Sequence, residues 1–502
     1  MSPHALAVKA QLMMKFDAQV SAVLESAENQ PLTLRSAEQA TWKAILPVGA
    51  DLLTGVLELQ CRVEAVRAVA ERGWTLDGVE PGVPRARLRL DDDYTAHLRS
   101  TFGPIDVRLF AVRKPGTSAT ICPARALFPH FPAMRSTDLL IEWECALAAD
   151  HPFRKAGEAL LFFTHGAADI EDTTIERHAV AVGNGIPRAM LYQAPAKIRE
   201  ILKDRATRDK KTGLPLVYAS TDAHALKRFV DDRWNPKWKM TNGIRLWATD
   251  AKTGKTIHLG GEVTWGDCLE VRKRFEWLQE QGILPKNGDY GEGVVAQVVL
   301  ATDGLGWIAD YVLPLYPGAV LVLDAYHVVH NVTEALKAVF RGKKNEPRVR
   351  RLVAQARRAL GMRTRRTRTA LRKGARLRRH ATRRSGFTGS GQRLLDEVLR
   401  PLLDKLTSGK SRFKKLISYI ERNLYRLGYS DLRKRGIAIG SGAMESIHRT
   451  GSQVRLKRAG CHWTADAAQG ILDLRMLMLS GRWTEYWDQA RPQHVETLGK
   501  AA

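Results

Sequence analysis

The sequence predicts an α/β domain that is interrupted by a basic helical insertion and preceded by a mostly helical N-terminal region. Three observations support this fold class. Apolar residues recur at helical spacing in the first 90 residues, and short apolar runs alternate with helical patterns between residues 213 and 340. The insertion is indicated by residues 341–385, which contain 19 Lys or Arg and only one acidic residue.

The composition favours a nucleic-acid partner. Of the 502 residues, 44% are hydrophobic, which suits a globular protein of two to four domains. Lys and Arg number 79 against 53 Asp and Glu, and the resulting net charge of +26 is typical of proteins that bind polyanions. No run of 18 or more apolar residues is present, so we expect no membrane-spanning helix and no membrane partner. The five scattered cysteines and the absence of a signal-peptide pattern predict a cytoplasmic protein.

The first 200 residues are predicted to contain three consecutive regions. Residues 1–94 form a helical N-terminal region, residues 95–136 a small β-hairpin region, and residues 137–200 a helix-turn-helix DNA-binding domain. The hairpin is indicated by alternating apolar and polar residues at 105–113, followed by a second short strand at 119–122.

The helix-turn-helix prediction rests on three helical patterns, at 137–148, 153–164 and 172–182, with a glycine-bearing connection between the last two. Asp172 or Thr173 suits the N-cap of the third helix. In this motif the N-terminal part of the last helix enters the major groove. The candidate DNA contacts are therefore Thr174, Arg177 and His178. An ordinary helical hairpin without DNA contact is the alternative.

From residue 213 the pattern becomes α/β, and residues 213–340 are predicted to form the first part of a catalytic core. Strands are expected at 217–222, 243–250, 255–261, 294–302 and 319–324, and helices at 268–281, 307–315 and 326–340. A hairpin followed by alternating helices and strands matches the order of RNase H-like domains. Residues 341–435 are then the basic helical insertion, and residues 436–490 complete the core.

Three carboxylates stand in matching contexts that point to metal-dependent chemistry. Asp222 and Asp303 each follow an apolar strand pattern, and Glu445 follows a glycine-rich entry into a helix. If they meet in space, three carboxylates can hold two divalent ions that clamp the attacking and leaving oxygens of a phosphodiester. Such hard oxygen ligands suit Mg²⁺, with Mn²⁺ as an alternative. Taken singly, each carboxylate also fits a turn, a strand-end cap or an exposed surface position.

Asp324 is a rival for the second metal ligand, because it too ends an apolar strand and begins the sequence Asp324-Ala-Tyr-His327. The alternative is structural, with Asp324 and His327 fixing the junction between strand and helix beside the site.

Basic residues near these carboxylates are candidate contacts to the DNA backbone, because each phosphate that is neutralised releases counterions. A simple hairpin cap is the alternative for Lys237 and Lys239. For the residues between 363 and 366 the alternative is a solvated surface or a localisation tail, and for those after Glu445 it is a solvated helix face. The candidates are Lys237, Lys239, Arg363, Arg365, Arg366, His448, Arg449, Arg455 and Lys457.

Together these stretches resemble bacterial insertion-sequence transposases of the DDE class, in the branch related to the Mutator and hAT lineages. The matching stretches are Ser220-Thr-Asp-Ala, Thr302-Asp-Gly-Leu-Gly-Trp-Ile, Leu323-Asp-Ala-Tyr-His-Val and Gly440-Ser-Gly-Ala-Met-Glu-Ser, and the resemblance covers roughly residues 95–485. It implies that Asp222, Asp303 and Glu445 are the catalytic, metal-binding triad, with Asp324 and His327 as an accessory motif.

The resemblance also implies an activity and its partners. The chain would bind the terminal inverted repeats of a mobile element, cleave phosphodiester bonds with two divalent ions, and transfer the 3′-hydroxyl ends to target DNA. It would act near the bacterial nucleoid as a homodimer or larger assembly on double-stranded DNA. The alternatives are an RNase H-like nuclease or resolvase without strand transfer, and a non-catalytic DNA-binding protein descended from a transposase.

Overall fold

A computed structural model describes most of the chain and divides it into two compact units. The first unit comprises residues 1–186 and 483–502, and the second comprises residues 187–482. The described residues are 3–30, 33–71, 75–76, 87–91, 95–113, 120–121, 134–228, 237–265, 267–362, 390–406, 409–459 and 461–490.

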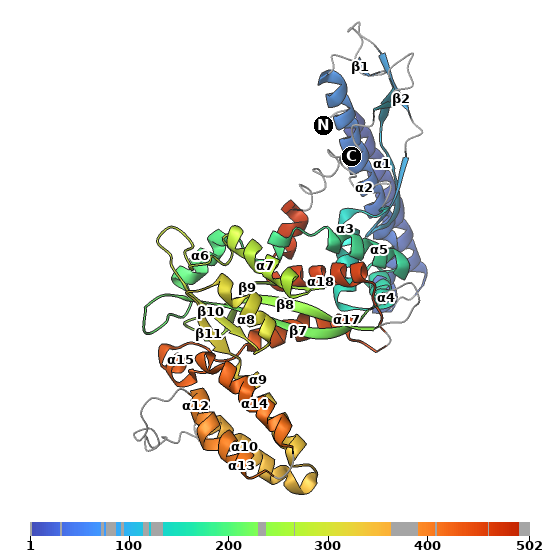
Figure 1. Ribbon diagram of the computed structural model, residues 1–502. Coiled ribbons are helices and arrows are strands. Elements are labelled where there is room, and N and C mark those ends of the chain that lie inside the picture. Colours follow the sequence, from blue (N-terminus) through green and yellow to red (C-terminus); the bar gives the residue numbers. More distant parts are fainter. Residues whose placement is uncertain are drawn as a thin grey trace. The chain divides into compact units, whose positions relative to one another are not determined.

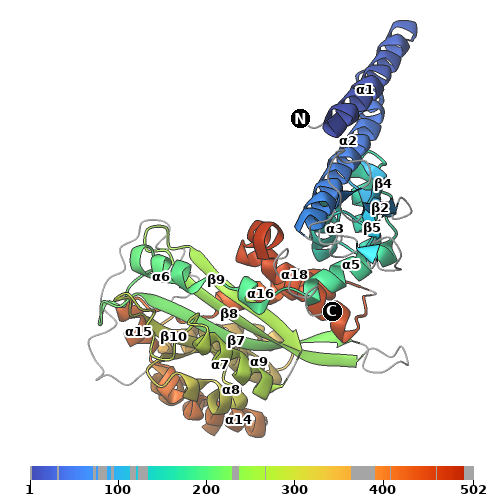
Figure 2. The same cartoon turned by 90° about the horizontal axis from the view of Figure 1, so that it is seen from above.

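Two long helices open the first unit, α1 (Pro3–Asn29) and α2 (Leu34–Glu71), and they lie side by side (Figures 1 and 2). They run antiparallel, since Lys15 near the middle of α1 pairs with Asp51 at 2.8 Å, while the earlier residue Val8 meets the later Gly55. Within α2, one stretch is long and apolar enough to cross a membrane by length and composition alone, and 11% of it is buried.

Short strands follow the helical hairpin. They are β1 (Thr75–Leu76), β2 (Arg87–Asp91), β3 (Thr95–Ser100), β4 (Gly103–Arg108), β5 (Ala111–Arg113) and β6 (Thr120–Ile121). β5 pairs antiparallel with β6, which confirms the end of the hairpin expected between 105–113 and 119–122. The expected first strand is divided, because residues 105–108 belong to β4, which pairs with β3. β3 and β4 form a separate ribbon that the sequence pattern did not reveal. Its inward side chains, such as Leu98 and Val107, share a core with Cys61 of α2.

Three further helices confirm the helical patterns at residues 137–182: α3 (Asp138–Asp150), α4 (Phe153–Phe163) and α5 (Asp172–Asn184). They pack against one another pairwise. The N-cap of α5 is Glu171, without a side-chain cap bond, so the expected capping by Asp172 or Thr173 is wrong. The connection between α4 and α5 spans residues 164–171, longer than the turn of about three or four residues in a compact helix-turn-helix. That motif stays a prediction. α19 (Trp483–Glu485) and η8 (Tyr486–Ala490) complete the unit.

The second unit is built on a mixed five-stranded sheet with the order β11-β10-β7-β8-β9. Its strands are β7 (Leu216–Arg228), β8 (Lys237–Thr249), β9 (Thr256–Trp265), β10 (Gln297–Thr302) and β11 (Val320–Leu323). β10 runs parallel to both β7 and β11, whereas β8 is antiparallel to β7 and β9. The mixed α/β class is as predicted, and this sheet is compatible with an RNase H-like domain.

Helices surround the sheet of the second unit. Before and between the strands lie η2 (Arg188–Leu191), α6 (Pro195–Asp204), α7 (Cys268–Glu280), α8 (Gly306–Tyr311) and η3 (Leu313–Leu315), and α9 (Ala325–Val339) follows the last strand. The inserted region contains η4 (Lys343–Asn345), α10 (Glu346–Ala359), α12 (Ser390–Leu394), η5 (Leu395–Leu399), α13 (Arg400–Asp404), α14 (Lys410–Arg422), η6 (Leu424–Arg426) and α15 (Tyr429–Arg435). The chain then forms α16 (Gly442–Ile447), η7 (His448–Gln453), α17 (Val454–Leu456) and α18 (Ala465–Ser480).

The inserted helices share one hydrophobic core with the sheet. Apolar side chains from β7, β10 and β11 continue into those of α9, α10 and α12–α15, without an intervening polar layer. Phe413 and Ile420 on the inner face of α14 are fully buried in this core. Figure 1 shows α9, α10 and α12–α14 packed together as one group of helices. The insertion is therefore a structural part of the α/β unit.

Candidate functional site

Two of the predicted carboxylates lie in one row at the edge of the parallel part of the sheet. The pairing of β10 with β7 runs to Leu300 opposite Ala219, and Asp303 and Asp222 each lie three residues beyond this last pair. The negative charge of Asp222 raises the pKa of Asp303, so the two carboxylates lie close enough to repel each other. Asp222 does not end its strand as expected, because β7 continues to Arg228 in a ribbon with β8.

The environment of Asp303 disfavours its charge. Its pKa is raised to about 6, chiefly because the half-buried side chain is partly removed from water; the N–H of Leu305, which donates to Oδ1 at 3.2 Å, opposes this rise, and the charge of Asp222 adds to it. Two carboxylates that repel each other in a partly buried place are an arrangement that a bound divalent cation would relieve. This pair therefore fits a metal ion.

Asp324 occupies the next place in the same row, because Leu323 of β11 pairs with Thr302 of β10. Its carboxylate is buried and fully engaged. Oδ1 accepts from the N–H groups of Tyr326 at 2.5 Å and His327 at 3.2 Å, and Oδ2 accepts from the N–H and hydroxyl of Ser441. Asp324 thus caps α9 and fastens the segment that leads into α16, which matches the structural alternative for this residue.

Glu445 lies on α16 and is exposed. The opposite side of this helix rests on β8, since an added Cβ at Gly243 would overlap the Met444 side chain and lie 2.8 Å from His448 Cε1. Gly243 is the partner of Asp222 in the strand pairing. α16 therefore packs beside the row formed by Asp222, Asp303 and Asp324, which we call the acidic row. Among the residues that the structure describes, however, no three His, Cys, Asp or Glu side chains are grouped to hold a metal ion. Glu445 is near the carboxylate pair without joining it.

His448 is the contact that joins this helical segment to the acidic row. It is 4% exposed, its Nε2 lies 3.5 Å from Asp222 Oδ2, and its ring meets that of His224 at 4.2 Å. Burial first, and then His224, lowers the pKa of His448 to about 4, so the imidazole is neutral at pH 7. The expectation that His448 contacts the DNA backbone is wrong, because its side chain faces the interior.

Arg426 is a residue of this site that the sequence did not reveal. Its side chain is 1% exposed, and Nη2 donates to the carbonyl oxygens of Thr302 at 3.3 Å and Asp303 at 3.0 Å, and also to the Thr302 hydroxyl. Nearby, Tyr429 donates its hydroxyl to the carbonyl of Leu323 at 2.6 Å. The end of the insertion thus clamps the carboxyl ends of β10 and β11.

The predicted DNA contacts fall into different environments. His178 is 1% exposed and its Nδ1 lies 2.6 Å from Glu144 Oε2, so it stabilises the packing of α5 on α3 and is not positioned to read DNA. Arg455 is also 1% exposed, with its guanidinium 4.7 Å from the centre of the Trp463 ring. The predictions that His178 and Arg455 contact DNA are therefore wrong, because both side chains are buried.

The other predicted contacts remain open to solvent or undescribed. Arg177, Arg449 and Lys457 are exposed, Thr174 and Lys239 are half-buried, Lys237 begins β8, and Arg363, Arg365 and Arg366 lie outside the described residues. Lys457 also lies 5.9 Å from the ring centre of Trp238, a distance suited to a cation–π contact.

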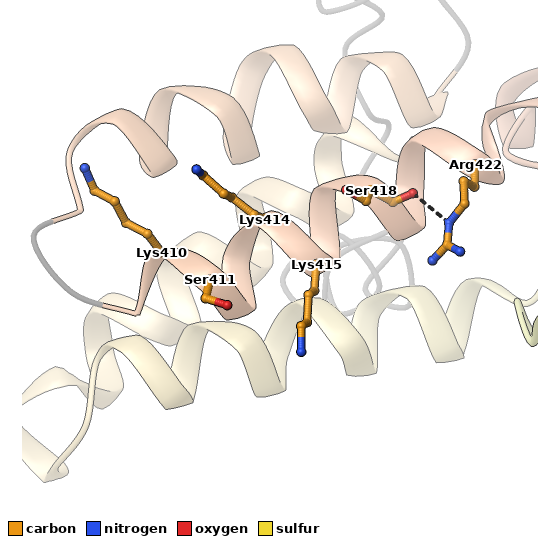
Figure 3. Close-up of a pocket in the computed structure, with 6 residues that line it drawn as sticks. All are labelled: Lys410, Ser411, Lys414, Lys415, Ser418 and Arg422. Carbon is orange, nitrogen blue, oxygen red and sulfur yellow. Dashed lines mark hydrogen bonds between the residues drawn. The ribbon is translucent and has the colours of Figure 1, made fainter.

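A basic groove on α14 adds a surface that the sequence analysis did not single out. It has a volume of about 630 Å³ and is lined by Lys410, Ser411, Lys414, Lys415, Ser418 and Arg422 (Figure 3). No acidic residue lines it, and within the described chain none of its three lysines forms an ion pair. The inner face of the same helix carries Tyr419, whose ring abuts Gly304 beside Asp303.

Comparison with known proteins does not assign this chain to a family. No protein-family model matches the chain, and no curated protein matches it. One similar solved structure is a chain of the Drosophila P element transposase strand transfer complex, with 12% sequence identity and a TM-score of 0.26. The match covers 68% of this chain and 92% of that chain. Similarity at this level does not establish a shared fold.

Proposed function

We propose that this protein is a DNA transposase that cleaves phosphodiester bonds and joins the resulting 3′ ends to target DNA. The observation that carries the proposal is the acidic row, in which Asp222 on β7 lies near Asp303 directly after the neighbouring strand β10, and α16 with Glu445 packs beside them. The motif resemblance supports it, because the matching stretches contain these three residues.

Each carboxylate has a distinct part in this proposal. Asp222 and Asp303 would hold divalent ions, preferably Mg²⁺, between neighbouring strands, and Glu445 would complete the ligand set from α16. When bound, two such ions activate the attacking oxygen and neutralise charge on the phosphate. Asp324 would position α9 and α16 around the site through its four hydrogen bonds, without binding metal.

The DNA contacts would come from exposed basic side chains of the second unit. The α14 groove presents four cations and two hydroxyl groups, a combination that suits successive backbone phosphates. Arg449 and Lys457 follow α16 and are exposed, so they would hold the backbone nearer to the acidic row.

The decisive experiment combines cleavage and joining of labelled DNA that carries the element's own ends. Wild type would be compared with Asp222→Asn, Asp303→Asn, Glu445→Gln and Asp324→Asn, with Mg²⁺ and with EDTA. We expect Mg²⁺-dependent cutting and joining in wild type, and loss of both with retained DNA binding in the first three variants. Asp324→Asn should instead lower stability and activity together.

Other outcomes would support the alternatives. Cutting of branched or hybrid DNA without a joined product would identify a nuclease or resolvase. Binding to the ends without any cutting in Mg²⁺ or Mn²⁺ would favour a non-catalytic protein. Full activity of Asp303→Asn, with none in Asp324→Asn, would move the second metal ligand to Asp324.

A further inference from the structure

The α1–α2 hairpin exposes many large apolar side chains, and contiguous apolar patches on a protein surface mark sites of interaction. Eleven large apolar side chains, five from α1 and six from α2, are between 36% and 59% exposed. They are Leu6, Met13, Phe16, Val20 and Leu24 of α1, and Trp42, Ile45, Leu52, Val56, Val63 and Val66 of α2.

These side chains form continuous stripes. Their spacing along each helix is three, four or seven residues, which places them on one face, as in helices that pack against other helices. The stripes meet in an apolar groove of about 440 Å³, whose lining includes Met13, Phe16, Leu52 and Val56. Among the described residues, Lys9 is the only charged one that lines it.

The charge of the hairpin argues against a polyanionic occupant. Its two helices contain six Lys or Arg and eight Asp or Glu, so their formal charge is −2 in a chain whose total is +26. Helices that bind an anionic membrane surface carry an excess of Lys or Arg on their polar face. Nucleic acid is disfavoured for the same reason.

We propose that the α1–α2 hairpin is a self-association surface that packs against the hairpin of a second copy of this chain as a bundle of four helices. An interface of standard size needs about 20 to 30 residues from each partner. Helices of 27 and 38 residues, with apolar stripes along much of their length, can supply them. The near-neutral charge lets two identical hairpins approach without strong repulsion. This inference stands apart from the proposed chemistry, since it concerns the DNA-free protein.

The test is the mass of the full-length, DNA-free protein, measured by light scattering during size-exclusion chromatography over a hundredfold range of concentration. We expect twice the mass of the chain, or a concentration-dependent shift toward it. The variant Leu52→Glu/Val56→Glu should weaken association at least tenfold. Leu269→Glu is the matched control, because Leu269 is 49% exposed on α7 and Leu52 is 51% exposed.

Circular dichroism and DNA binding would show that the variant remains folded. Mixing differently tagged wild-type copies and recovering one with the other gives a second readout that needs no variant. A monomer at every concentration would overturn the proposal, as would association that the double substitution leaves unchanged. A monomer that sediments with phosphatidylcholine–phosphatidylglycerol vesicles, and loses this property in the double variant, would show a membrane partner instead.

Discussion

Replacing Asp303 by asparagine should stabilise the protein while abolishing its proposed activity. Asp303 is half-buried, and partial removal from water is the main reason why its pKa is raised from 3.8 to about 6. Asparagine keeps an oxygen that can accept the N–H of Leu305, yet it carries no charge to bury. The substitution therefore removes an unfavourable charge and preserves the local hydrogen bond.

The size of this stabilisation and its dependence on pH both follow from the raised pKa of Asp303. A raised folded-state pKa means that the folded protein binds the proton more tightly, so the cost of Asp303 is absent below about pH 4 and complete above about pH 6. The rise in the pKa of Asp303 from 3.8 to about 6 corresponds to about 3 kcal/mol of stability at pH 7. Thermal unfolding of Asp303→Asn in EDTA should then occur about 5 °C higher than wild type at pH 7.5. The difference should vanish at pH 4.

Two controls accompany this experiment: a second substitution, Asp250→Asn, and the addition of Mg²⁺. Asp250→Asn should have the opposite effect, because the N–H of Thr253 and then Arg205 lower the pKa of Asp250 to about 2. Its loss of stability at pH 7 should shrink as the pH falls toward 2. Adding Mg²⁺ should stabilise wild type and leave Asp303→Asn unchanged if Asp303 binds the ion. An Asp303→Asn protein that is less stable than wild type at pH 7.5, or a difference independent of pH, would refute the reasoning.

Three further substitutions test the surroundings of the acidic row. Arg426→Lys keeps a charge but loses the fork of hydrogen bonds to the end of β10. We therefore expect a destabilisation of about 2–3 kcal/mol, measured by denaturant unfolding. Single-turnover cleavage should be slower, while DNA affinity should be unchanged. Gly243→Ala introduces a Cβ where α16 packs, and a cost of about 1–3 kcal/mol together with reduced cleavage is expected; wild-type stability would contradict that packing. Lys414→Glu/Lys415→Glu should weaken DNA binding about tenfold and reduce its salt dependence by about two phosphate contacts, measured by titration at several salt concentrations. Lys337→Glu is the control: Lys337 is ion-paired with Glu334, so its replacement should leave DNA affinity and salt dependence unchanged.

The sequence predicted the elements whose burial leaves a local signature. β10 and β11 are covered on both faces, which requires continuous apolar runs, and both were located within a few residues. The far half of β7, residues 223–228, mixes apolar and polar side chains without a regular alternation, so its pairing with β8 and not its hydrophobicity defines it. Boundaries set by a partner strand leave no periodic trace in one sequence.

The sequence predicts the acidic residues of the site but not the residues that hold them in place. Asp222 and Asp303 follow recognisable strands, whereas Arg426 meets Thr302 across 124 positions of the chain. A lone arginine between Tyr425 and Leu427 has no signature that separates a buried clamp from a surface charge. His178 shows the converse, because its place on a predicted recognition helix gave no sign that Glu144 would hold it inside.

The bonds between the start and the end of the second unit have a consequence for synthesis of the protein. Arg435 pairs with Asp209 across 226 positions, and the Ala438 N–H donates to the Tyr218 hydroxyl across 220 positions. At about 5–20 residues per second, a ribosome needs roughly 10 to 45 seconds to make this intervening stretch. During that time the strand carrying Asp222 exists without the residues that complete its core. A prematurely terminated chain would therefore have the first carboxylates but no assembled site.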